Sequence, residues 1–93
     1  MELVKLSPAQ LSIINVILQV DGEGKAKQYP LSELTVASEI FKAIKQCVKE
    51  DKFVEGKLNF TSEQKVFITK QIDERNWTVV DAEVVFELKS ILK

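Results

Sequence analysis

The sequence predicts a mainly α-helical fold, a compact bundle of about four helices, and three observations support this. Apolar residues recur at helical spacing in four segments. Two of these segments open with the same capping-box pattern, Ser7-Pro8-Ala9-Gln10 and Thr61-Ser62-Glu63-Gln64. The chain has 93 residues, of which 45% are apolar and 29% charged, as in an ordinary globular domain. We therefore expect a single domain over residues 1–93.

The first helix is expected from Pro8 to about Val20, inside a stretch of 15 residues without a formal charge, residues 6–20. Ser7 suits the N-cap, and proline suits the first helical position. Apolar side chains cover most of the circumference of this helix, so it needs partners on several sides. It is too short to span a bilayer, and we expect it to pack against other helices or a second subunit. The candidate interface residues are Leu11, Ile14, Ile17 and Leu18.

A polar segment with two glycines follows, and it predicts a mobile loop over about residues 21–29. A second helix is expected from about Ser32 or Thr35 to about Asp51. Its apolar positions share one face: Ala37, Ile40, Phe41, Ile44, Cys47 and Val48. Because Cys47 falls within this pattern, we expect it to be a small buried hydrophobic residue.

A third, half-exposed helix is expected from Ser62 to about Arg75, followed by an extended segment over residues 76–80. Asp81 can cap a last helix, whose apolar residues have helical spacing: Val84, Val85, Leu88, Ile91 and Leu92. Residues 78–88 are also rich in valine, which is compatible with a β-hairpin. We favour the helix, since no Asn-Gly or Asp-Gly turn divides the segment. A short two-stranded β element is expected at residues 3–6 and 57–60, and it would bring the starts of the first and third helices together.

The residue types that most enzymes use are scarce in this chain. It has no histidine, which excludes histidine-based acid–base catalysis and Ser-His-Asp or Cys-His nucleophile systems within one chain. Its single cysteine cannot build a zinc site of the common Cys/His kind. We therefore expect no enzymatic activity, no cofactor and no metal.

Four lysines of the second expected helix are spaced by three, four and three residues and would lie on one stripe beside its apolar face. The stripe is a candidate surface for phosphate groups, for an acidic protein, or for the acidic last helix of a neighbouring molecule. The alternative, which we favour, is a solvated stripe whose lysine stems cover the edge of the core. Trp77 is either a core residue or a partner contact. Together the candidate surface residues are Lys42, Lys45, Lys49, Lys52 and Trp77.

Charge argues against nucleic acid and membranes as partners. The net charge is −1, which predicts no general attraction to nucleic acid or to an anionic membrane. The last two helices have the lengths of a helix-turn-helix motif, but the second of them would begin Asp81-Ala82-Glu83 and set carboxylates against phosphates. Residues 1–5 lack the pattern of a signal peptide, so we expect a cytoplasmic protein. Lysine outnumbers arginine twelve to one, which is typical of an AT-rich genome such as that of a low-GC bacterium or its phage. For a phage protein the compartment would be the host cytoplasm.

These observations favour a small non-enzymatic protein–protein interaction module, a regulatory, inhibitory or scaffolding accessory protein that self-associates through its first helix. The protein partner is not identified by the sequence. The alternative is an oligomeric protein that binds a nucleotide or another small phosphate-bearing ligand, with the lysine stripe and the loop at residues 21–28 lining a pocket between subunits. Nucleic-acid binding is a weaker third hypothesis.

Overall fold

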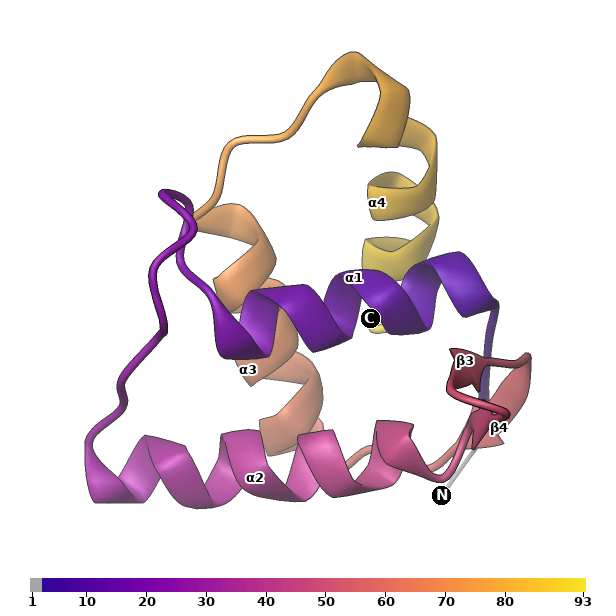
Figure 1. Cartoon of the computed structure of the whole chain (residues 1–93), viewed down its shortest axis with the longest axis horizontal. Helices are drawn as coiled ribbons and strands as arrows, with labels where there is room; N and C mark the ends of the chain where they lie inside the picture. The colour runs from indigo at the N-terminus through magenta and orange to yellow at the C-terminus, as the bar shows by residue number, and fades with distance from the viewer. Residues whose placement is uncertain (1–2) are drawn as a thin grey trace.

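The computed structural model describes residues 3–93, which form helices and two small antiparallel strand pairs (Figure 1). This confirms the prediction of a mainly α-helical fold with a small β element. No helix within the described residues is long and apolar enough to cross a membrane. In chain order the elements are β1 (Val4–Leu6), α1 (Pro8–Gln19), α2 (Leu31–Lys45), β2 (Val48–Lys49), β3 (Lys52–Phe53), β4 (Gly56–Leu58), α3 (Ser62–Asp73) and α4 (Val79–Ile91).

Helix α1 is the central element of the fold. It contacts α2, α3 and α4 and also touches β3. In Figure 1 it crosses the middle of the molecule, with α2 below it, α3 behind it and α4 rising above it. A helix with neighbours on so many sides must be apolar around most of its circumference, which explains the uncharged stretch in the sequence.

Both predicted capping boxes are present. At the start of α1, the Ser7 hydroxyl accepts a hydrogen bond from the Gln10 backbone N–H at 3.2 Å, and Gln10 Oε1 accepts one from the Ser7 backbone N–H at 2.8 Å. Thr61 and Gln64 repeat this exchange at the start of α3, with distances of 3.1 and 2.9 Å. Each box satisfies two backbone N–H groups that a helix start leaves without partners.

The last helix confirms the helical interpretation of residues 78–88 and excludes the hairpin. It begins earlier than predicted, however, because Thr78 and not Asp81 occupies the N-cap position, with extended backbone angles. Asp81 lies in the first turn, where a carboxylate favours the positive end of the helix dipole, and accepts a hydrogen bond from the Thr78 hydroxyl at 3.2 Å.

Strands β1 and β4 pair antiparallel, with Val4 opposite Leu58 and Leu6 opposite Gly56. The predicted pairing of residues 3–6 with 57–60 is therefore confirmed, although β4 begins one residue earlier and ends two residues earlier than predicted. The expected consequence was wrong, because antiparallel pairing makes α1 and α3 leave the strand pair at opposite ends. Leu6 and Leu58 point into the core.

The second helix ends at Lys45, six residues before the predicted end at Asp51. The chain turns at residues 46–47 and forms a hairpin in which Val48 pairs with Phe53. Its two turn residues, Glu50 and Asp51, both have positive φ, of 53° and 64°. Such turns usually contain Asn-Gly or Asp-Gly, so this sequence carries no recognisable turn pattern. Tertiary packing of the hairpin overrides the helical spacing of its residues.

The segment predicted as a mobile loop reverses the chain between α1 and α2. The Asp21 carboxylate accepts hydrogen bonds from the backbone N–H groups of Glu23 and Lys25, at 2.8 and 3.0 Å. These two hydrogen bonds hold the pKa of Asp21 below its usual value. The Lys27 backbone N–H then bonds the Gln19 carbonyl at 2.9 Å and closes the turn. The mobility of this segment stays a prediction.

Candidate interaction surfaces

The four candidate interface residues of the first helix lie in the core of the chain itself. Leu11, Ile14 and Ile17 are fully buried, and Leu18 retains 5% of its exposure. They pack against the other helices and present almost no surface to a second subunit. An interface made by these four side chains would require the core to open, so a surface for self-association would have to lie elsewhere.

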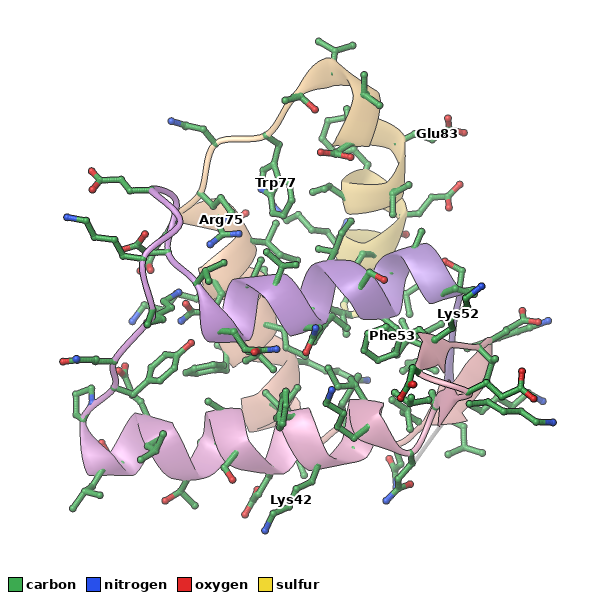
Figure 2. All side chains as sticks on the ribbon, in the orientation of Figure 1. Lys42, Lys52, Phe53, Arg75, Trp77 and Glu83 are labelled. Atoms are coloured by element: carbon green, nitrogen blue, oxygen red, sulfur yellow. The ribbon has the colours of Figure 1, made fainter. Side chains whose placement is uncertain are left out.

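The four candidate lysines do not form one helical stripe, which corrects that prediction. Lys42 and Lys45 are on α2, whereas Lys49 and Lys52 face each other across the β2–β3 hairpin. The helix ends before it reaches the last two, so the spacing of three and four residues no longer places them in line. Figure 2 shows Lys42 below α2 and Lys52 beside the hairpin.

Lys45 covers aromatic rings at the edge of the core. Its ammonium nitrogen lies 4.9 Å from the centre of the Phe41 ring and 5.9 Å from that of Phe53. A cation over the face of an aromatic ring is attracted by the ring quadrupole. Lys45 therefore covers apolar surface while its side chain stays exposed, as in the alternative favoured for the lysines.

Trp77 lies on another side of the molecule and is half-buried. Its indole N–H donates a hydrogen bond to the Ile72 carbonyl at 3.0 Å, and its ring packs against the core. It also lines a small hollow of about 210 Å³ together with residues of α1, including Ile13 and Val16. In Figure 2 Trp77 is above α1 and Lys42 is below α2, so the structure does not combine them into one surface.

A groove of about 360 Å³ runs between α1 and α2. Its lining is mainly apolar and aromatic, and none of the described residues that line it carries a carboxylate. The lining residues are Leu18, Gln19, Lys27, Tyr29, Leu34, Ala37, Ser38 and Phe41. We call it the α1–α2 groove. Lys27 stands at the end nearest the Tyr29 ring, 5.7 Å from its centre, and Lys45 lies over Phe41 towards the other end. The groove is therefore apolar with a cation near each end.

The carbonyl end of α1 is capped by side chains from elsewhere in the chain. The helix has no basic residue in its last turn. Instead, the Tyr29 hydroxyl donates to the Leu18 carbonyl at 2.9 Å, Lys27 Nζ approaches the Ile17 carbonyl at 3.5 Å, and Arg75 donates to the Val20 carbonyl. Cations at this position offset the negative end of the helix dipole.

Burial affects the two titratable groups of this cap that come from the connecting segment. It lowers the pKa of Lys27, with a further lowering by the neighbouring Arg75, and it raises the pKa of Tyr29. Lys27 Nζ also donates a hydrogen bond to the Gln71 side chain of α3. The cap thus joins α1, the connecting segment and α3. These residues were not predicted from the sequence, where the missing cation in the last turn of the first helix is the only indication of such a cap.

A wider hollow of about 590 Å³ lies between α3 and the end of α4. Its charged lining residues are four lysines and two carboxylates, and Lys89 Nζ contacts an Asp73 carboxylate oxygen at 2.5 Å. Lysines therefore outnumber carboxylates in this lining, which carries an excess of positive charge.

Helix α4 presents an apolar and acidic face to solvent. Val79 is 92% exposed, Val80 88% and Phe86 70%. Glu83 and Glu87 are exposed beside them, and Figure 2 shows Glu83 pointing away from the body of the molecule. We call these five residues the α4 ridge. Apolar spacing in the sequence predicted only the inward positions of this helix, of which Val85, Leu88 and Leu92 are buried. In the sequence, the ridge is visible only as apolar residues of this segment that do not belong to the predicted inward positions.

Comparisons with known proteins add no resemblance to this description. A scan against protein-family models, a search of curated proteins and a search of solved structures each found no match.

Proposed function

We propose that this protein is a non-enzymatic interaction module that self-associates through the α4 ridge and acts as a regulatory, inhibitory or scaffolding accessory protein. The supporting observation is the exposure of Val79, Val80 and Phe86, at 92%, 88% and 70%, on one helix. Full burial of a valine or phenylalanine side chain contributes about 1.5–3 kcal/mol. A second molecule that covers the ridge would contribute a substantial part of this burial free energy for each of the three side chains.

The ridge differs from the other exposed apolar residues in its extent. Leu3 and Val66 are exposed at 59% and 68% on separate parts of the chain, and Leu31 and Leu34 form a smaller pair at the start of α2, at 82% and 45%. Single exposed apolar residues are normal on protein surfaces, whereas grouped ones are typical of interaction sites. The grouping of three strongly exposed side chains on α4 is thus the property that favours an interaction role.

Static light scattering across a concentration series tests this proposal. We expect the mass of the wild-type protein to rise above that of one chain as concentration increases, and we expect Phe86→Glu to abolish the rise. Val66→Glu is the matched control, because Val66 is exposed to a similar degree on α3, and it should behave like the wild type. A wild-type protein that has the mass of one chain at every concentration, or a Phe86→Glu variant that still associates, would overturn the proposal.

A second candidate function is the binding of a small phosphate-bearing ligand, and the α1–α2 groove is the observation that favours it. The groove has Lys27 beside the aromatic ring of Tyr29, and Lys45 lies over the ring of Phe41. Lys27 already contacts the Ile17 carbonyl and the Gln71 side chain, which leaves it less available for a phosphate. Thermal-shift measurements with a nucleotide panel test this function, and we expect any stabilisation to be lost when Lys27 and Lys45 are replaced together by glutamine. A flat response across the panel would exclude it.

A further inference from the structure

We propose that the α4 ridge of one molecule docks into the α1–α2 groove of a second copy, so that the protein assembles head to tail. This inference rests on the proposed self-association and adds the receiving surface. Charge, spacing and the positions of the two surfaces support it.

Charge disfavours the simplest alternative, in which two ridges pair with each other. The ridge contains Glu83 and Glu87 but no cation, as the sequence shows. A two-fold interface places the same patch of both subunits together, so the four carboxylates would share one contact. Like charges brought together in a desolvated interface are destabilising. The ridge therefore needs a receiving surface of opposite character.

The α1–α2 groove has that character. Tyr29, Leu34 and Phe41 provide partly exposed apolar surface along it for the ridge side chains. Lys27 and Lys45 lie near its two ends, and no carboxylate is among its described lining residues. An amphipathic helix lying in an apolar groove with charges of opposite sign at the rim is a recurring mode of protein recognition.

The spacing of apolar side chains also matches. Val79 and Phe86 are separated by seven residues on α4, and Leu34 and Phe41 by seven residues on α2. At 1.5 Å per residue, each pair is about 10 Å apart along its helix axis. A helix lying along the groove would bring both apolar pairs into contact at once. Along the helix, Glu83 lies between Val79 and Phe86, and Glu87 follows Phe86. In the docked arrangement these glutamates would be within reach of the lysines near the ends of the groove.

The two surfaces belong to different sides of the molecule. Figure 1 shows α4 above α1, and α2 below it. One copy cannot cover its own ridge with its own groove, and a contact between two different patches is heterologous. Each added molecule exposes a new ridge or groove, so the assembly grows into a ring or an open chain.

Mixing two variants tests this inference. Phe86→Glu removes the ridge and leaves the groove intact, whereas Ser38→Glu with Lys45→Glu adds carboxylates to the groove and leaves the ridge intact. All three positions are exposed or on helix surfaces, and glutamate is compatible with a helix. We expect each variant alone to have the mass of one chain, and an equimolar mixture to reach twice that mass and no more. One intact ridge then meets one intact groove.

The matched control carries the same change in charge outside the groove, Thr35→Glu with Lys49→Glu, and should associate like the wild type. If the groove variant alone still associates like the wild type, or the mixture stays at the mass of one chain, the head-to-tail inference fails. Loss of association in Phe86→Glu would then still support the proposed function. A wild-type protein that never associates would overturn both.

Discussion

Gly56 is the residue at which a single added methyl group has the clearest consequence. It begins β4 opposite Leu6, and an added Cβ would overlap the Cys47 sulfur. Cys47 is 93% buried, as its place among apolar residues predicted, and it has little room to move. Glycine is thus required here by close approach, since its φ is not in the left-handed region.

We expect Gly56→Ala to lower the free energy of unfolding by about 1–3 kcal/mol, the usual cost of overpacking a core. Urea denaturation followed by circular dichroism measures this. Gly22→Ala is the control, because an added Cβ at Gly22 meets nothing within 4 Å and its φ is not left-handed, so its stability should change little. Equal stabilities of the two variants would show that the core adapts to the extra methyl group.

At the scale of elements, helix starts and helix ends are encoded differently. Ser7 with Gln10 and Thr61 with Gln64 are local patterns, because a capping box connects residues three apart. The end of α1 depends on Tyr29 and on Arg75, which is 55 residues away from its acceptor. A pattern search along the chain therefore recognises the starts and misses this end.

Tyr29→Phe tests the cap on α1. The variant keeps the ring, whose centre lies 5.8 Å from that of Phe67, and removes the hydroxyl that donates to the Leu18 carbonyl. We expect it to lose about 1 kcal/mol of unfolding free energy, the usual net contribution of one hydrogen bond. Thr35→Ala removes an exposed hydroxyl-to-carbonyl hydrogen bond within α2 and should cost less. If the two substitutions cost the same, the Tyr29 hydroxyl is not a significant part of the cap.

For the whole molecule, the decisive feature is that one uncharged helix is surrounded by the others. The sequence left open whether α1 meets other helices of its own chain or a second subunit. Ile14 and Ile17 are fully buried in the single chain, which favours a core role. The surfaces proposed for a second copy are therefore the α4 ridge and the α1–α2 groove, both outside that core.

Neighbouring substitutions on α1 distinguish these roles. We expect Ile17→Asp to abolish the folded state, because it places a charge in the core. Val16→Asp, one residue away and 45% exposed, should leave a cooperative unfolding transition. Circular dichroism during thermal unfolding measures both. A folded, monomeric Ile17→Asp variant would instead support an interface role for α1.

Sequence alone determined the features that depend on local patterns: the helical class, two capping boxes, the central helix and the inward positions of α4. Periodicity and capping act over a few residues, so they can be recognised without a structure.

Only the tertiary structure decided where α2 stops, how α1 is capped and which apolar residues remain outside. The helical spacing of α2 continues in the sequence through Val48, yet the chain folds back there and Val48 pairs with Phe53. Val79 and Phe86 are as apolar as the core residues, and their exposure follows from the absence of a neighbouring element beyond α4 within residues 3–93. Exposure is a property of the packed chain, because it depends on what lies beside a residue in space.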